Sequence, residues 1–274
     1  MWNPPTKPST KARLLFFQRS LPGWRALGGM CGALCLLAGP ACASGVVSLN
    51  LCTDQLLVLL APERIAALSP LARDPSLSVV AAQAAAMPWV RADTEAVLRL
   101  RPDLVLAGDY GAQAVVAALR GRGITVVQVT EPRDFAGVAS EIDAVAQALG
   151  QPARGEALVA TMQARLAAIP PARRGNAVFW EARGFSAGPG SFGDAVLRAA
   201  GYRNAGTGGE MGVEALAAHP PDILITNAAP AYPSLATDML WHPALRHLRR
   251  TSVAPALMAC AGPWSAGAVE ALAR

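Results

Sequence analysis

The formal net charge of +5 on this 274-residue chain comes entirely from its first 43 residues, which carry five of the 24 Lys and Arg and none of the 19 Asp and Glu. The rest of the chain has no net charge, which argues against a basic surface for nucleic acid. Roughly 230 residues remain after this segment, enough for one large α/β domain or for two lobes of ordinary domain size.

The first 43 residues have the parts of a secretory signal peptide. Basic residues between Lys7 and Arg25 precede an apolar segment at 26–38, and Ala41-Cys42-Ala43 supplies small residues before an expected cleavage at Ser44. The apolar segment is shorter than the roughly 20 residues that a membrane span needs, and no later stretch is long and uncharged enough. We therefore expect a soluble secreted chain. Lipid attachment at Cys42 is the alternative, which the preceding Gly39-Pro40-Ala41 fits poorly.

The chain from residue 44 onward alternates short apolar runs with helical patterns. A strand is expected at 46–49, followed by a helix at 55–60 that Thr53 or Asp54 can cap. Further expected strands are 65–68, 104–107 and 124–129, and further expected helices are 111–121 and 135–149. Residues 71–87 are Ala-rich and predict no clear element.

A long helix is expected from Pro152 to Ile169. Proline suits a first helical position, and Pro170-Pro171 cannot continue the ladder. Leu158, Met162 and Leu166 lie on one side at helical spacing. We interpret this helix as a beam between two lobes.

The second half repeats the pattern of the first, with strands expected at 177–180, 223–226 and 253–258 and helices at 191–200 and 266–274. Glu95 and Glu214 each open a short helix and are each followed seven residues later by Pro-Asp and an apolar strand. The predicted fold class is α/β, with two Rossmann-like lobes whose parallel sheets are covered by helices. The predicted boundaries are 1–43 for the signal peptide, 44–151 for the first lobe, 152–169 for the interlobe helix and 170–274 for the second lobe.

Ligands of parallel sheets bind outside the carboxyl ends of the strands. The segments that follow the predicted strands are 50–52, 108–110 and 130–131 in the first lobe and 181–185, 227–229 and 260–264 in the second. If the lobes face each other across the beam, these loops line one cleft.

These residues together resemble the periplasmic binding proteins of ABC importers for iron chelates and cobalamin, in which one long helix joins two lobes. The resemblance covers nearly all of 44–274, and its most telling pieces are 46–50, 95–108, the beam, 185–190 with 200–204, and 214–226. It implies a periplasmic monomer that captures a ferric siderophore, cobalamin or haem and delivers it to a membrane permease and its ATPase. None of these pieces is a catalytic motif, so no enzyme activity and no resident cofactor or metal is expected.

The resemblance also implies roles for single residues. In that family a glutamate at the tip of each lobe docks onto arginines of the permease, and the matching positions are Glu95 and Glu214. An acid in the first turn of a helix is also favoured by the macrodipole, which explains either glutamate alone but not the shared spacing.

The candidate ligand-binding residues combine cleft loops with aromatic rings. Trp89 matches a cleft tryptophan of the cobalamin-binding relatives, whereas Gly208 stands at the corresponding place in the second half. A second aromatic wall would come from Phe185, Tyr232, Trp241 or Trp264. The predicted set is Asn50, Cys52, Trp89, Tyr110, Arg183, Phe185 and Trp264.

The sequence gives weaker support to an oxidoreductase, a zinc site or a hydrolase than to a binding protein. Gly188-Pro-Gly190-Ser-Phe-Gly193 satisfies G-x-G-x-x-G, but it does not follow a strand directly and contains a stiff proline, which disfavours an NAD-dependent oxidoreductase. Three histidines, of which His242 and His247 flank a turn, are too few for a zinc site with a second shell. Ser186 and Ser191 have no His nearby in sequence to activate them as hydrolase nucleophiles.

Cys52 and Cys260 both follow predicted strands and should lie on the cleft side of their sheets. They could form a disulfide, contact a bound metal centre as thiolates, or pack as two unpaired small residues. Sequence alone favours two unpaired cysteines.

Overall fold

The computed structural model describes residues 45–227 and 238–274, and the side chain of Trp241 is not described. The predicted signal peptide, Tyr232 and the Trp241 ring therefore lie outside the described part of the chain. Residues Cys42–Arg274 form one compact unit. Within the described residues, no helix combines the length and apolar character needed to cross a membrane.

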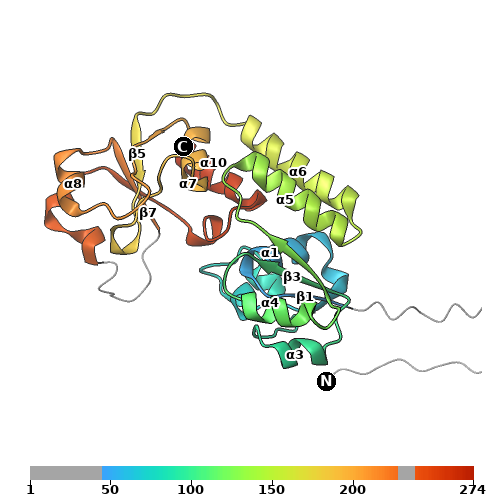
Figure 1. Ribbon diagram of the computed structural model, residues 1–274. Coiled ribbons are helices and arrows are strands. Elements are labelled where there is room, and N and C mark those ends of the chain that lie inside the picture. Colours follow the sequence, from blue (N-terminus) through green and yellow to red (C-terminus); the bar gives the residue numbers. More distant parts are fainter. Residues whose placement is uncertain (1–44, 228–237) are drawn as a thin grey trace, which may run out of the picture. The chain divides into compact units, whose positions relative to one another are not determined.

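Each half of the chain builds a four-stranded parallel sheet (Figure 1). The first sheet has the order β2-β1-β3-β4, and the second has the order β6-β5-β7-β8. The strands are β1 Val46–Ser48, β2 Ile65–Ala67, β3 Leu104–Gly108, β4 Thr125–Val129, β5 Asn176–Phe179, β6 Arg203–Asn204, β7 Ile223–Asn227 and β8 Arg250–Val253. The two sheets thus share one topology, in which the first strand of each half pairs with the second and third.

The helices connect these strands, as expected for parallel neighbours. They are α1 Leu51–Leu60, α2 Ala81–Ala84, α3 Thr94–Arg99, α4 Gln113–Arg120, α5 Phe135–Ala148, α6 Pro152–Ala167, α7 Phe192–Ala199, α8 Val213–Ala218 and α10 Ala266–Ala273. The repeated motif occupies equivalent places, since α3 leads into β3 and α8 leads into β7. The α/β class, the two parallel sheets and the joining helix predicted from the sequence are confirmed.

Helix α1 begins four residues earlier than predicted, and its cap is different. Asn50 is the N-cap, and its side-chain oxygen accepts hydrogen bonds from the backbone N–H groups of Cys52 at 2.8 Å and Thr53 at 3.4 Å. Asp54 is instead buried and accepts hydrogen bonds from the Ser69 backbone at 3.0 Å and the Ser69 hydroxyl at 2.5 Å. Burial outweighs these hydrogen bonds and raises the pKa of Asp54 to about 7. The capping prediction for Thr53 or Asp54 was therefore wrong, because an amide one turn earlier has the better geometry.

The last strand begins at Arg250, three residues earlier than predicted. β8 ends at Val253, and residues 255–257 form a 3-10 turn that begins at Pro255. Proline lacks the N–H that a strand ladder requires, so the apolar run at 254–258 leaves the sheet. Strand β6, which has two residues, was not predicted at all.

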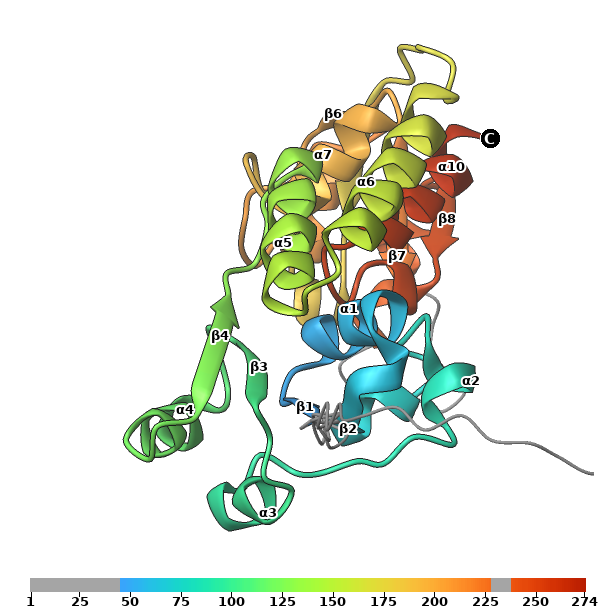
Figure 2. The same ribbon diagram turned by 90° about the vertical axis from the view of Figure 1, so that its right-hand side faces the viewer.

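The beam α6 begins at Pro152, as predicted, and lies beside α5 (Figures 1 and 2). Gly155 and Met162 are its buried positions, and a side chain at Gly155 would collide with the Cβ atom of Ala146 on α5 at 2.6 Å. The close approach of these two helices therefore depends on a glycine.

Two ion pairs hold the ends of α6 to different lobes. Arg154 lies 2.8 Å from Glu63 of the first lobe, and Arg165 lies 2.8 Å from Glu270 on α10 of the second. The Arg165 pair is bidentate, since a second guanidinium nitrogen lies 2.9 Å from the other carboxylate oxygen. The core supports the same arrangement, because one buried cluster runs from β1 through Met162 on α6 to α10.

Candidate functional site

The candidate site lies where the carboxyl ends of strands from both sheets meet. β3 is followed by Asp109 and Tyr110, and β4 is followed by residues 130–133. The second lobe contributes 188–192, the glycine-rich segment before α7, and the loop at Ala259 and Ala261 after β8. Parallel strands bring their carboxyl ends to one edge of each sheet, and this edge is the usual place for a ligand.

The larger of two adjoining hollows has a volume of about 410 Å³. Its first-lobe wall consists of Tyr110 and residues 130–133, and its second-lobe wall consists of 188–192 and Gly208. Gly188 and Gly208 are in backbone contact, so any side chain at Gly188 would strike the neighbouring loop. Edge-to-face packing of Phe135 on Phe192, with ring centroids 5.3 Å apart, joins the N-terminal ends of α5 and α7.

The smaller hollow has a volume of about 150 Å³ and shares Tyr110, Glu131 and Pro132 with the larger one. Asn50 and Cys52 from the start of α1 and Glu141 from α5 complete its first-lobe wall, together with Gly108, Asp109 and Val129. Ala259 and Ala261 form its second-lobe side. The two hollows thus form a continuous cleft that residues of both lobes line.

Glu141 is the buried ionisable group of this cleft. The residue is 8% exposed, and no hydrogen bond or ion pair joins its side chain to another described residue. Burial, and to a smaller extent the negative charge of Glu131, raises the pKa of Glu141 to about 7. The carboxyl is therefore divided between its neutral and charged forms near neutral pH.

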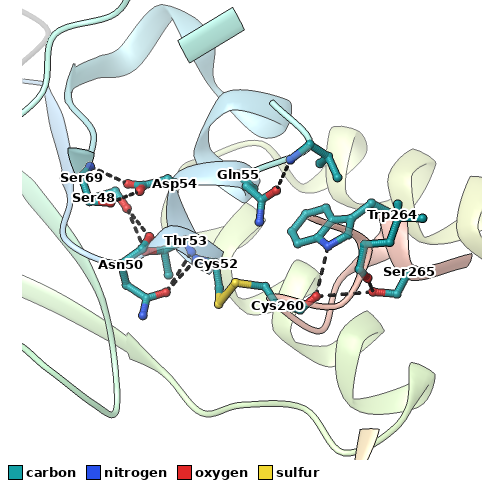
Figure 3. The surroundings of a disulfide bond; sticks show 12 residues. Ser48, Asn50, Cys52, Thr53, Asp54, Gln55, Ser69, Cys260, Trp264 and Ser265 are labelled. Carbon is teal, nitrogen blue, oxygen red and sulfur yellow. Dashed lines mark hydrogen bonds between the residues drawn. A yellow bond between two sulfur atoms is a disulfide. The ribbon is translucent and has the colours of Figure 1, made fainter. Parts of the chain in front are cut away.

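A disulfide closes one side of the smaller hollow and connects the lobes. Cys52 in the first turn of α1 is bonded to Cys260, with Cα atoms 5.4 Å apart (Figure 3). The sequence favoured two unpaired cysteines, and this interpretation was wrong. The strand ends of the two lobes approach more closely here than an open cleft would allow, which brings the two sulfur atoms within bonding distance.

The predicted ligand residues divide into two groups. Asn50, Cys52 and Tyr110 line the cleft, and Tyr110 is 78% exposed. Trp264 lies away from both hollows: it is 7% exposed, and its indole N–H donates to the Cys260 carbonyl at 3.1 Å (Figure 3). Tyr110 is thus the aromatic ring of the predicted set that the structure brings to the hollows.

The remaining predicted residues are exposed but do not line either hollow. Trp89 is 47% exposed and lies 5.9 Å beneath the Arg73 guanidinium. Phe185 is 51% exposed, and Arg183 beside it adopts the left-handed backbone conformation, with φ of 63°. These three side chains are available to solvent or to a ligand larger than the hollows.

Sequence reasoning missed Glu141, Arg133 and the segment 188–192 as cleft residues. Glu141 was detectable, because it lies three residues after Val138 and four before Val145, on the apolar stripe of its helix. A carboxylate on an apolar stripe indicates either a structural partner or a site. Arg133 carried no comparable signal.

The glycine-rich segment is poorly suited to a dinucleotide phosphate. The N–H of Gly190 donates to Asp194 at 3.1 Å, and the N–H of Asp194 donates to the Ser191 hydroxyl at 3.2 Å. Two backbone donors that would bind a phosphate at this helix terminus are therefore already used by side chains of the protein.

Glu95 and Glu214 lie in the first turns of α3 and α8 and are both exposed. Asp103 and Asp222, the aspartates of the same motif, have structural roles. Asp103 lies 2.7 Å from Arg64, and Asp222 accepts a hydrogen bond of 2.7 Å from the backbone of Asn176. The repeat thus places an acid at corresponding points of the two lobes.

A protein-family model described as "Periplasmic binding protein" matches residues 46–249, which include every strand of both sheets except β8. The chain belongs to the periplasmic binding protein family. Among solved structures, a periplasmic haem-binding protein from Pseudomonas aeruginosa is 25% identical, with a TM-score of 0.66 over 84% of this chain and 91% of that one. The vitamin B12-binding protein BtuF of Vibrio cholerae, at 16% identity, shares the fold, with a TM-score of 0.63 over 84% of this chain and 95% of that one.

A curated relative, the cobalamin-binding protein of Halobacterium salinarum, is 30% identical over 150 residues. The match covers 50% of this chain and 41% of the relative, so this periplasmic binding protein corresponds to less than half of that protein. These three relatives are binding proteins.

Proposed function

We propose that this chain is the substrate-binding component of an ABC importer, which captures a metal chelate in the interlobe cleft and delivers it to a membrane permease. The candidate chelates are haem, cobalamin and ferric siderophores, of which the first two are bound by relatives named above. The observation that carries the proposal is the cleft itself. Its volume of about 410 Å³ in the larger hollow falls within the range of small-molecule sites, and loops from both lobes line it.

Tyr110 is proposed as the principal aromatic contact. Among the described residues its ring is the most exposed of the large apolar side chains, and it borders both hollows. An aromatic ring held at the mouth of a cleft can stack on a flat ligand at a low cost in conformational entropy. Asn50 and Cys52 would contact the ligand deeper in the cleft, and Trp89, Arg183 and Phe185 would contact it at the rim.

Glu95 and Glu214 are proposed to dock the two lobes onto the permease. Both are exposed acids at matching positions of the repeated motif, and neither has an ion-pair partner among the described residues. Charges at a rim govern encounter and register with a partner more than they govern affinity for a ligand elsewhere. The protein would act in the periplasm as a monomer, without catalysis.

Ligand binding is the direct test. The purified protein is titrated with haemin, cyanocobalamin and a panel of ferric siderophores, with quenching of protein fluorescence and thermal unfolding as readouts. At least one chelate should bind with a dissociation constant in the micromolar range or below. Tyr110→Ala should weaken binding of that chelate. Leu100→Ala should not, because it removes an exposed apolar side chain at the end of α3, before β3 begins and outside both hollows. Failure of every chelate to bind would refute the proposal.

A further inference from the structure

Glu141 has no structural role that explains its burial. The residue lines the smaller hollow and is only 8% exposed, and its carboxyl has no hydrogen-bond or ion-pair partner among the described residues. An unpartnered buried carboxyl destabilises a fold, because its charged form loses hydration and receives nothing in return. Such a cost is typical of groups that are kept for a ligand.

The residues that line the smaller hollow with Glu141 are acidic or neutral. The titratable groups that face it are Asp109 and Tyr110 after β3 and Glu131 after β4. α1 contributes Asn50 and Cys52, and the second lobe contributes two alanines. Within the described part of the chain, no Arg, Lys or His lines this hollow, since Arg133 borders the larger one.

These carboxylates are not arranged as a bare cation site. The described residues contain no group of three or more His, Cys, Asp and Glu side chains that could hold a metal ion. The carboxyl groups that line the hollow, those of Asp109, Glu131 and Glu141, are hydrogen-bond acceptors next to apolar walls, and the hollow has a volume of about 150 Å³. Such a hollow admits one substituent of a larger ligand, provided that this substituent carries N–H donors.

We propose that Glu141 selects the chelate, by receiving an amide or ammonium substituent of the ligand in the smaller hollow. This inference rests on the proposed function and narrows it. A neutral chelate with primary amides at its periphery, such as cobalamin, or a cationic one with a free ammonium, such as ferrioxamine B, complements the acceptors. Haem is disfavoured, because its two propionates would add negative charge beside Glu131 and Glu141.

The test compares cyanocobalamin, ferrioxamine B and haemin on the unmodified protein and on Glu141→Ala, Glu141→Gln and Glu156→Ala. Glu156 is an exposed acid on α6 outside both hollows and serves as the matched control. The unmodified protein should bind cyanocobalamin or ferrioxamine B at least tenfold more tightly than haemin. Glu141→Ala should weaken the preferred chelate by roughly tenfold, the loss expected for one hydrogen bond to a carboxyl.

The Glu141→Gln variant and the pH dependence of binding show whether the ligand's hydrogen-bond donor is an amide or an ammonium group. Glu141→Gln keeps a carbonyl acceptor, so it should preserve binding of an amide-bearing ligand and weaken binding of an ammonium-bearing one. Binding of ferrioxamine B should tighten between pH 6 and pH 8 in the unmodified protein as Glu141 ionises, and this change should be absent in Glu141→Gln. Thermal unfolding confirms that each variant is folded.

Two results would overturn the inference: haemin binding more tightly than both other chelates, or Glu141→Ala leaving the preferred chelate's affinity unchanged. A protein that binds none of the three chelates, nor any ferric siderophore of the wider panel, would instead refute the proposed function. The two failures are therefore distinguishable.

Discussion

Breaking the disulfide between Cys52 and Cys260 should strongly destabilise the protein. The bond closes a loop with a sequence separation of 208 residues and connects α1 of the first lobe to the segment before α10. In the chain-entropy treatment, cross-linking a loop of this length removes roughly 5 kcal/mol of conformational freedom from the unfolded chain. The loop is long because the partners lie near opposite ends of the folded region, so the effect is near the upper end of the usual range.

Urea denaturation with and without a reductant measures this contribution. The buried cluster that runs through both lobes and α6 favours one cooperative transition. With an m-value of roughly 2.5 kcal/mol per molar urea, a loss of about 5 kcal/mol shifts the midpoint by about 2 M. The double variant Cys52→Ala/Cys260→Ala should match the reduced protein and should not respond to reductant. Non-reducing peptide mapping should recover the two cysteines as one linked peptide pair.

A midpoint shift below about 0.4 M on reduction, corresponding to about 1 kcal/mol, would refute this reasoning. It would mean that the unfolded chain is already restricted, or that strain in the folded protein offsets the entropic gain. Recovery of Cys52 and Cys260 as separate unlinked peptides would refute the bond itself.

Three further outcomes are expected. The radius of gyration from small-angle scattering should change little when a chelate binds, because α6 is ion-paired to both lobes and the disulfide links them; a marked decrease would contradict this. The double variant Glu95→Ala/Glu214→Ala should retain chelate affinity but lose uptake in a transport assay, and each single variant should be milder; loss of affinity would argue against docking. The folded-state pKa of Glu141, about 7, lies above its ordinary value of 4.5, so the folded protein holds the proton more tightly than the unfolded chain does. The free energy of unfolding should therefore fall by up to about 3 kcal/mol as the pH rises from 4.5 through 7. Glu141→Gln should therefore raise the free energy of unfolding at pH 8 and leave it unchanged at pH 4, and equal effects at both values would exclude titration of Glu141 as the cause.

The sequence by itself determined the local elements and their order. Proline positions at 152 and 170–171 marked the limits of the beam, and the apolar runs after each Pro-Asp marked β3 and β7. These signals act over a few residues, through backbone geometry and side-chain periodicity, so they can be recognised without knowing what packs against them. The repeat of Glu95 and Glu214 belongs to the same class, because it depends on spacing alone.

The tertiary structure decided which of these residues meet. Trp89 and Trp264 were both candidate cleft aromatics, yet one is about half exposed and the other is buried. Cys52 and Cys260 looked unpaired, yet they are bonded, and Glu141, which was not among the predicted site residues, lines the smaller hollow. Burial and pairing depend on which strand ends and helix faces from distant parts of the chain come together, and residues 208 apart in sequence carry no local signal of that approach.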